Sequence, residues 1–371
     1  MRVGILTFQQ SNNYGALLQT YALQQTLQNL GVQADVLRFP PVSIRATVRR
    51  FLDLAIGHRF VPAMTAHIKY AMFRHKRFQY SAICRNDTNL KHVCNTYDAI
   101  VVGSDQVWNT NFGPHMKSYF LPFGDDLHSR RISYAPCFGR PDQPQFLYTF
   151  APELLHRFNW LSARNEFSRV LVQELTGLDV PVVADPTMLY DYADFCNAIP
   201  YGLPNEYILI YALEPKDAHL GVKVVAASRR TMDIPVVTIT SSAHMDWDFP
   251  DSDYVVKSAS PEEWVSLFRG ARFVFTDSFH GAVFSLKYRK DFLAYGDDGW
   301  RSHRLLDLLH RYGVQKRFVT NAKLDCVPDL LNTHIDHSDT HNYITKHIEY
   351  SMEYLHTALE SKLVLPNEVI V

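Results

Sequence analysis

A histidine stands directly after an apolar, strand-like run in the segment TDSFHGAVFSL. The run ARFVF leads into Asp277, Ser278 and His280, and Gly281 then opens a stretch with helical apolar spacing. A histidine exchanges protons near neutral pH, and the start of a helix attracts an anion. We therefore predict proton transfer beside a bound anion, with His280 as the catalytic residue and Asp277 orienting its imidazole. In the alternative interpretation, His280 caps its own helix or bonds a backbone carbonyl.

Two further segments place polar side chains at strand ends. NNYGALLQ begins a helix, and IVVGSDQVWN ends a buried strand. Unpaired N–H groups at a helix start favour an anion, while polar donors beside an indole favour a sugar. The first segment lacks the GxGxxG pattern, so it does not support dinucleotide binding. A capped helix start and a plain turn are the alternatives. The residues predicted to contact a saccharide acceptor are Asn13, Tyr14, Ser104, Asp105, Gln106 and Trp108.

Charged residues follow three other predicted strands. Arg164, in LSARNEFSRVL, is expected to reach a crevice where its guanidinium matches a carboxylate or phosphate, with an ion pair to Glu166 as the alternative. Asp185 precedes Pro186, which is typical of a structural turn. In GDDGWRSHRLLDLL the acidic residues suit the start of a helix, so we expect no metal site there.

The elements that must position these residues alternate between strand and helix. RVGILTF (2–8), a helical stretch ending at Gly31 and VQADVLRF (32–39) form a predicted βαβ unit. The pattern restarts after the polar stretch 190–206. Further strands are expected at 98–103, 131–135, 158–163, 180–184, 207–213, 234–240, 272–276 and 291–295, and later helices near 217–231, 261–270, 280–288, 301–312 and 340–362.

This alternation predicts an α/β protein with two Rossmann-like domains and an interdomain cleft at the carboxyl ends of the strands. The first domain is expected at residues 1–192, with a basic helical insertion at about 40–80, and the second at residues 193–340. Residues 341–371 are expected to form a C-terminal helix that packs back toward the N-terminal domain.

Composition excludes several classes of protein. The 371 residues carry 37 Lys and Arg against 38 Asp and Glu, so no global charge selects a nucleic acid, and we expect no nucleic-acid partner. The five cysteines are scattered, which argues against a disulfide framework and indicates a reducing cytoplasm. No signal peptide or membrane span is apparent. The basic, amphipathic stretch 45–77 suggests contact with the cytoplasmic membrane face, and a solvated basic face is the alternative.

Taken together, the segments resemble the polysaccharide pyruvyl transferase family. The resemblance rests on collinear matches over about residues 1–312: GILTF…NNYGALLQTYALQ, DAIVVGSDQVWN…YFLPF, RRISYAPCFG, ARNEFS…LTGLDVPVVADPTML and FVFTDSFHGAVFSL. It implies a fold similar to the GT-B glycosyltransferases and transfer of an enolpyruvyl unit from phosphoenolpyruvate to a hexose, closing to a pyruvate ketal with release of phosphate. Phosphoenolpyruvate is then a co-substrate, and no cofactor is expected.

The resemblance also implies roles for single residues. His280 is similar to the family's catalytic histidine, and Arg164 to the arginine that holds the donor. Many members carry Arg two positions before this histidine, where this chain has Ser278. Binding of the donor phosphate would then fall to other groups. The full set expected on the donor side is Arg164, Ser278, Gly281, Arg301 and Arg304.

Two other functions compete with this interpretation. A GT-B-type glycosyltransferase would use a nucleotide sugar in the same kind of cleft. A non-catalytic protein that binds a glycan or a phosphoanion would explain the missing arginine at position 278. For the pyruvyl transferase, the basic stretch suggests a saccharide acceptor on a polyprenyl lipid. The sequence does not choose among hexoses, or between 4,6 and 3,4 ketals.

Overall fold

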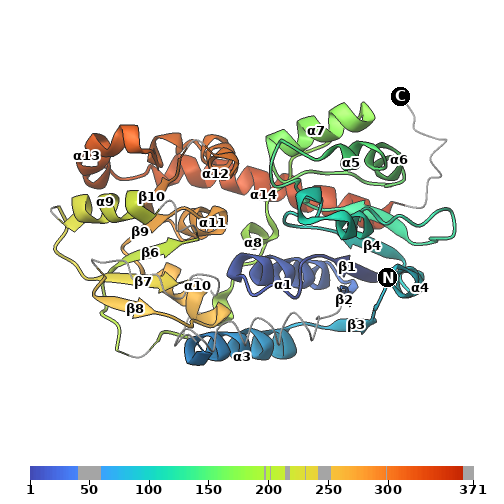
Figure 1. Cartoon of the computed structure of the whole chain (residues 1–371), viewed down its shortest axis with the longest axis horizontal. Coiled ribbons are helices and arrows are strands. Elements are labelled where there is room, and N and C mark those ends of the chain that lie inside the picture. The colour runs from blue at the N-terminus through green and yellow to red at the C-terminus, as the bar shows by residue number, and fades with distance from the viewer. Residues whose placement is uncertain are drawn as a thin grey trace.

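The computed structural model describes residues 1–40, 60–195, 198–200, 202–213, 218–229, 231–240, 252–297 and 299–361. Two parallel β-sheets, each flanked by helices, lie side by side along the long axis of the molecule (Figure 1). The first sheet comes from the N-terminal half of the chain and the second from the C-terminal half. The predicted α/β fold with two Rossmann-like halves is confirmed.

The first sheet has the strand order β3-β2-β1-β4-β5, and every neighbouring pair is parallel. Its central strands are short apolar runs buried on both faces, as expected where helices cover a parallel sheet. The strands are β1 (Arg2–Leu6), β2 (Gln33–Arg38), β3 (Tyr80–Ile83), β4 (Ala99–Val102) and β5 (Arg130–Ser133), with helices α1 (Tyr14–Asn29), α3 (Phe60–Arg77) and α4 (Asp87–Cys94) between them.

The second sheet has the order β11-β10-β9-β6-β7-β8 and is also parallel throughout. Helix α10 starts with a capping box between Ser260 and Glu263, which satisfies two otherwise unpaired N–H groups. The strands are β6 (Ile208–Ala212), β7 (Val236–Thr240), β8 (Tyr254–Val256), β9 (Phe273–Thr276), β10 (Asp291–Tyr295) and β11 (Phe318–Val319), and the helices are α9 (Ala218–Arg229), α10 (Pro261–Gly270), α11 (Phe279–Lys287) and α12 (Trp300–Arg311).

Short helices connect the two sheets, and two predicted strands there are wrong. Residues 158–163 and 180–184 are extended but pair only through isolated bridges, Ile132 with Trp160 and Ala163 with Val182. Pro181 removes one backbone donor, which weakens any continuous pairing. The connecting helices are α5 (Gln145–Tyr148), α6 (Ala151–His156), α7 (Glu166–Thr176) and α8 (Pro186–Leu189), with 3₁₀ turns η1 (Thr110–Phe112), η2 (Pro114–Phe120) and η3 (Ala193–Phe195).

The last long helix, α14 (His337–Glu360), runs from the second half across to the first (Figure 1). Its Tyr354 hydroxyl donates to the carbonyl of Ser133 at 2.9 Å, and its Ser351 hydroxyl accepts the Ala184 N–H at 2.8 Å. The 3₁₀ turns η5 (Gln315–Arg317) and η6 (Asn321–Cys326) and helix α13 (Val327–Asn332) precede it. Helix α14 therefore holds the segment that ends at residue 184.

Helix α3 lies along both halves (Figure 1), and three of its described basic residues are paired within the protein. Lys69 Nζ lies 2.7 Å from a Glu263 carboxylate oxygen, and Arg77 pairs with Asp194 and Glu262. Three of the basic residues predicted to face a membrane, Lys69, Arg74 and Arg77, are therefore engaged in the protein instead, because Arg74 also donates to Asn12. Residues 45–59 of the same predicted stretch lie outside the described residues.

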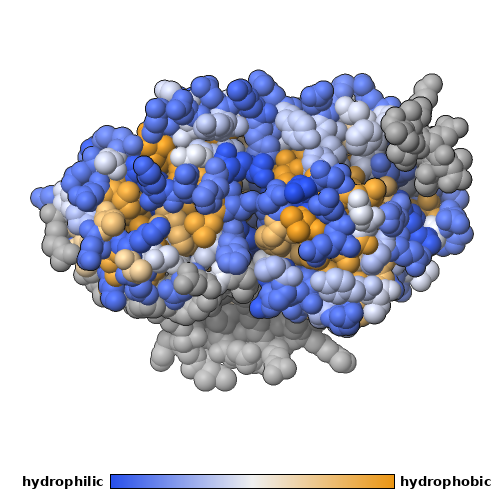
Figure 2. Space-filling model, turned by 90° about the horizontal axis from the view of Figure 1, so that it is seen from above, coloured by the Kyte–Doolittle hydropathy of each residue, from blue (hydrophilic) through white to orange (hydrophobic). Residues whose placement is uncertain are grey.

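A single apolar cluster runs through both halves. It includes Val3 of β1 and Leu209 of β6, and the ring of Tyr14 at the start of α1 stacks on Trp264 of α10, with centroids 5.6 Å apart. Seen from above, the surface mixes hydrophilic residues with smaller apolar patches over both halves (Figure 2). The two sheets are thus joined by packed aromatic side chains, and this packing fixes the relative position of the strand ends.

Candidate active site

One cavity of about 780 Å³ lies where the two sheets meet. In the first sheet, the chain order reverses between β1 and β4, and in the second between β6 and β9. Ligands bind at such reversal points, outside the carboxyl ends of the strands. Residues that directly follow β1, β4, β6 and β9 all line the cavity, including Thr7, Asp105, Leu213 and Asp277. The predicted cleft at the strand ends is therefore present as a single space.

His280 lies in the first turn of α11 and lines this cavity, with 11% of its side chain exposed. Ser278 is the N-cap of α11, because its hydroxyl accepts the Gly281 N–H at 3.3 Å. A Cβ at Gly281 would lie 2.2 Å from the Thr276 hydroxyl, so glycine is needed for this turn to pack on β9. Gly281, which the sequence predicts on the donor side, is buried and lies outside the cavity lining.

A second helix start meets His280 from the other half of the chain. Asn13 caps α1 by accepting the Ala16 N–H at 3.1 Å, and both Asn13 and Tyr14 line the cavity. A Cβ on Gly15 would lie 2.1 Å from Nδ1 of His280. Only a glycine at this position lets the imidazole approach the start of α1. Two helix N-termini therefore converge around the histidine, and both favour negative charge.

Below the cavity lies a group of buried polar residues that we call the floor: Ser104, Cys137, Arg164 and Asp185. Arg164 Nη1 donates to Asp185 Oδ2 at 3.0 Å, and its Nη2 donates to Asp105 Oδ1 at 3.3 Å and approaches Cys137 Sγ at 3.0 Å. The Arg164 side chain is 1% exposed. Its guanidinium also lies over the ring of Phe279, 4.6 Å from the centroid. The predicted ion pair with Glu166 is not made, since Glu166 pairs with Arg169.

Arg164, which the sequence predicts to hold the donor, is buried in this structure. Its side chain does not line the cavity, and both of its terminal nitrogens are used by protein groups. Arg164 instead holds two carboxylates in place. Desolvation would lower the pKa of this guanidinium, but Cys137, Asp105 and Asp185 together raise it above its ordinary range. Arg164 is therefore a fixed positive charge under the cavity.

Asp185 connects the floor to the histidine. As the sequence predicts, it forms a turn: its Oδ1 accepts the Thr187 N–H at 3.1 Å. Its Oδ2 also lies 3.5 Å from Nε2 of His280 and 3.3 Å from the Ser104 hydroxyl. Burial alone would raise the pKa of Asp185, but His280, Arg164 and Thr187 together hold it well below its usual range. Asp185 is thus a buried carboxylate, ionised at neutral pH, behind the imidazole.

The predicted partner of the imidazole, Asp277, has a different contact. Its Oδ1 accepts the Leu213 N–H at 2.7 Å, which ties the end of β9 to the end of β6. Asp277 lines the cavity, but the carboxylate beside Nε2 of His280 belongs to Asp185. Asp277 and His280 are close in sequence, but their side chains have different partners at the end of β9. The carboxylate beside the imidazole comes instead from Asp185, in the first half of the chain.

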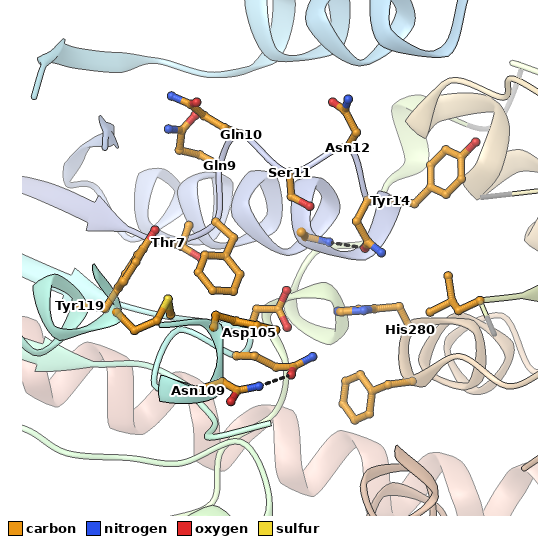
Figure 3. Close-up of a pocket in the computed structure, with 18 of the residues that line it drawn as sticks. Thr7, Gln9, Gln10, Ser11, Asn12, Tyr14, Asp105, Asn109, Tyr119 and His280 are labelled. Atoms are coloured by element: carbon orange, nitrogen blue, oxygen red, sulfur yellow. Dashed lines mark hydrogen bonds between the residues drawn. The ribbon is translucent and has the colours of Figure 1, made fainter. Parts of the chain in front are cut away.

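Among the described residues, Asp105 is the acidic residue that the first half contributes to the cavity lining. Its backbone has φ +75, a left-handed conformation that non-glycine residues rarely adopt. The conformation lets the carboxylate contact Arg164 below while 13% of the side chain stays exposed. Figure 3 shows Asp105 and His280 pointing toward one another from opposite walls of the cavity. Gln106 also lines the cavity and accepts a hydrogen bond from Asn109 at 3.1 Å.

Three predicted acceptor ligands have no free group for a sugar. Trp108 is fully buried, stacks on Phe120 and donates to the Tyr119 carbonyl. The Ser104 hydroxyl is buried among floor groups. Tyr14 touches the cavity, but its hydroxyl donates to the Ala259 carbonyl at 3.0 Å, and Figure 3 shows its ring pointing away from the cavity. In each case the side chain packs against, or hydrogen-bonds to, other parts of the protein. The local sequence does not reveal these contacts.

Two arginines supply positive charge to the described part of the cavity wall. Arg304 of α12 lines the cavity from the second half and Arg140 from the first. Arg301 lies in the first turn of α12, but its side chain is outside the described residues. Within the described ranges, no group of three or more His, Cys, Asp or Glu residues has an arrangement suited to a metal ion.

Sequence reasoning missed two residues of this arrangement. Asp185 is predicted chiefly as a turn former, and Gly15, at the first strand-to-helix turn, has no predicted role in the site. The signal for Asp185 was its place at the end of an apolar run, which is where the other site residues stand. Gly15 gave a weaker signal, a glycine in the first turn of a helix, where it costs helix stability without an evident local reason.

The comparison with solved structures supports the fold. UDP-GlcNAc 2-epimerase from Neisseria meningitidis, solved with UDP-GlcNAc bound, aligns over 97% of this chain and 99% of its own, with TM-score 0.53 and 13% identity. An O-GlcNAc transferase from Thermobaculum terrenum aligns over 97% of this chain with TM-score 0.52 and 10% identity, and this chain spans 66% of its length. These likenesses show a GT-B-like fold alone. No helix in the described part of the chain is long and apolar enough to cross a membrane.

The comparison with curated proteins gives no significant match. The family comparison does give one, and it covers the residues that build the cavity. The model for polysaccharide pyruvyl transferases matches residues 13–299, from the cap of α1 past α11 to the start of α12. The chain is therefore an enzyme of the polysaccharide pyruvyl transferase family.

Proposed function

We propose that this enzyme transfers a pyruvyl group from phosphoenolpyruvate to a hexose, forming a pyruvate ketal across two hydroxyls and releasing phosphate. One observation carries the proposal. His280, Asp105 and Arg304 line a single cavity between two helix N-termini, and a buried carboxylate stands behind the histidine. An acid, a base and an anion site thus lie together, as transfer from an enol phosphate requires.

The donor is held by charge. The N-termini of α1 and α11 both face the cavity through Asn13, Tyr14, Ser278 and His280. In our proposal, their N–H groups and the guanidinium of Arg304 bind the phosphate and the carboxylate of the donor. Arg304 then supplies the positive charge that family relatives with Arg at position 278 carry on α11. Ser278 keeps the helix capped and leaves space beside the histidine.

His280 is the general acid. In our proposal, His280 gives its ring proton to the methylene carbon of the donor, while Asp185 lies behind the imidazole, 3.5 Å from Nε2. A donor anion about 4 Å away contributes about 4 kcal/mol per unit charge at an effective dielectric of about 20, which outweighs the opposing helix dipole of about 0.3–2 kcal/mol. Asp185 adds a second negative charge on the other side. The donor and Asp185 thus place negative charge on both sides of the imidazole.

Asp105 is the base for the attacking hydroxyl. Protonation of the methylene carbon makes a methyl group and leaves an electron-poor carbon, which the first hydroxyl attacks. Loss of phosphate takes the electrons of its C–O bond, and the second hydroxyl closes the ketal. Of the two hydroxyl protons, one balances the proton gained by the methyl group and the other leaves with phosphate. Arg164 keeps the Asp105 carboxylate in place between these steps.

The direct test measures the products. The purified chain is incubated with phosphoenolpyruvate and a panel of galactosides, glucosides, mannosides and N-acetylmannosaminides. We expect phosphate release that depends on the sugar, and a sugar product with the mass of a pyruvate ketal. Phosphate release without a ketal, or a ketal without phosphate release, would contradict the proposed reaction.

The same assay separates the other functions. A glycosyltransferase of the same fold would be stabilised against heat by a nucleotide sugar and not by phosphoenolpyruvate. A binding protein would be stabilised by an anion or a glycan and would release no phosphate in any combination. We expect the largest thermal shift with phosphoenolpyruvate, because a compact trianionic donor suits two helix N-termini and Arg304.

We further propose a cytoplasmic enzyme that meets a polyprenyl-linked saccharide at the membrane face, for polysaccharide biosynthesis. Val61, Ile68 and Met72 form an exposed apolar stripe on α3, at 72%, 49% and 64% exposure. The paired Lys69, Arg74 and Arg77 would not take part. Changing Ile68 and Met72 to Glu should weaken binding to vesicles of anionic lipid, measured by co-sedimentation. Unchanged binding would remove α3 from the membrane contact.

A further inference from the structure

The cavity is larger than the proposed reaction needs. At ordinary packing density, phosphoenolpyruvate and one hexose would fill about half of its 780 Å³. His280 and Asp105 face one another at one end (Figure 3). The remaining volume extends between the β1–α1 loop and the turn η1, away from His280, toward Tyr119 (Figure 3). The far end therefore has room for a further part of the acceptor.

The far end differs from the reacting end in chemistry. Its apolar wall is aromatic: the Phe8 ring lies 5.3 Å from Tyr119 in an edge contact and 6.2 Å from Phe112. Phe112 is 51% exposed and lines this part of the cavity. Neutral amides surround these rings. Those that line the cavity are Gln9, Gln10, Gln106, Asn109 and Asn111.

Phe112 is held rigidly in its exposed position. Its N–H donates to the Asn109 carbonyl at 3.2 Å, and the Asn109 side chain caps the turn by accepting the Asn111 N–H at 3.2 Å. Asn109 is itself nearly fully buried. A rigid aromatic face loses little conformational entropy when a ligand covers it. The turn η1 thus presents a preformed apolar surface bordered by amide groups.

We infer that this far end is a subsite for a second sugar residue, so that the enzyme takes an acceptor of at least two residues. The inference rests on the proposed function. A pyranose ring has an apolar C–H face that packs on an aromatic ring, and hydroxyls at its edge that bond to amides. An alkyl or prenyl chain would use the rings but could not hydrogen-bond to the amides that border them, such as Gln10 and Asn111.

The test compares acceptors that differ by one residue. Methyl glycosides of galactose, glucose and mannose are compared with disaccharides that end in the same sugars, using kcat/KM for phosphate release. We expect the preferred disaccharide to exceed its monosaccharide by about tenfold, the effect of one stacked ring with its hydrogen bonds. Phe112→Ala should reduce this ratio to about one. Phe146→Ala is the control, because Phe146 is 37% exposed on α5 and does not line the cavity.

Binding in the absence of donor separates this inference from the proposed reaction. Saturation-transfer NMR with the disaccharide alone should show contact to the second residue in the wild type and in Phe146→Ala, and lose it in Phe112→Ala. A disaccharide advantage that survives Phe112→Ala, or equal rates for both acceptor lengths, would overturn the subsite. So would octyl glycosides that replace the second sugar without loss. Failure of phosphate release with every acceptor, while the NMR pattern holds, would contradict the reaction and leave the subsite standing.

Discussion

The floor and the wall of the cavity both carry charged side chains, and the two sets do different work. On the floor, Arg164 and Asp185 have side chains 1% and 2% exposed and are paired with each other. On the wall, His280, Asp105 and Arg304 face the space where substrates bind. A charge sealed behind protein groups can only set the position and protonation of its neighbours. A charged side chain that faces the cavity can contact a substrate. Resemblance in sequence does not distinguish a buried positioning residue from a residue that contacts substrate, whereas burial in the structure does.

The sharpest way to break this comparison is Arg164→Met. Removing the guanidinium leaves Asp185 buried without its main partner, which should reduce the free energy of unfolding by about 3–5 kcal/mol. Urea unfolding measures this loss. Arg169→Met is the matched control, since Arg169 pairs with Glu166 and Asp179 on the surface and should change stability little. If Arg164→Met folds as stably as the wild type and only weakens donor binding, Arg164 belongs to the wall.

His280→Gln tests the wall in the same way. Glutamine keeps a polar side chain of similar reach but cannot supply the proton, so kcat should fall at least about 100-fold. The affinity for phosphoenolpyruvate, measured by calorimetry, should change little because Arg304 and the helix N-termini remain. His303→Gln is the control, an exposed histidine on α12. Near-normal turnover in His280→Gln would exclude it as the acid.

The free energy of unfolding should also depend on pH, through His347 of α14, which contacts the segment before the floor residue Asp185. His347 Nε2 donates to the carbonyl of Val182, three residues before Asp185, and burial lowers the pKa of His347 to about 4. The unfolded chain has a histidine pKa of about 6.5, so between those values it binds more protons than the folded chain. This contribution to stability is complete above about pH 6.5 and falls by about 2 kcal/mol from pH 7 to pH 5.

Urea unfolding of the wild type and His347→Gln at both pH values measures this change. Glutamine does not titrate in this range, so the variant should lose less stability on acidification. Equal losses in the two proteins would show that other groups carry the pH dependence. The variant also removes the bond from the Tyr312 hydroxyl to Nδ1, so its stability at pH 7 serves as its own reference.

Gly15→Ala tests the contact between the start of α1 and His280 on the cavity wall. The added methyl would lie 2.1 Å from Nδ1 of His280 and must displace the imidazole. We expect kcat to fall about tenfold, the effect of a misplaced acid. Stability should change little, because alanine favours the helix by about 0.5–1 kcal/mol. Asn29→Ala, at the exposed end of α1, is the control. Unchanged kcat would mean that the histidine tolerates another position.

Local patterns allowed much of the fold to be predicted. The βαβ start, the strands β6, β9 and β10 and the helices α10, α11 and α12 stand within one or two residues of their expected bounds, because each has a clear apolar period or cap. The strands predicted at 158–163 and 180–184 were wrong, because a strand-like composition does not guarantee a neighbouring strand to pair with. Strand β11 spans only two residues and gave no usable period.

The sequence by itself determined where the site would lie: His280, Asp105 and Asn13 all stand at strand ends or helix starts, and parallel sheets bring such ends together. Only the tertiary structure decided which side chains face the cavity. Trp108 lies in the core and Arg164 in the floor, and Asp185 contacts His280 from about ninety-five positions earlier in the sequence. The physical reason is that spacing along a chain sets the face of an element, whereas exposure depends on what packs against that face.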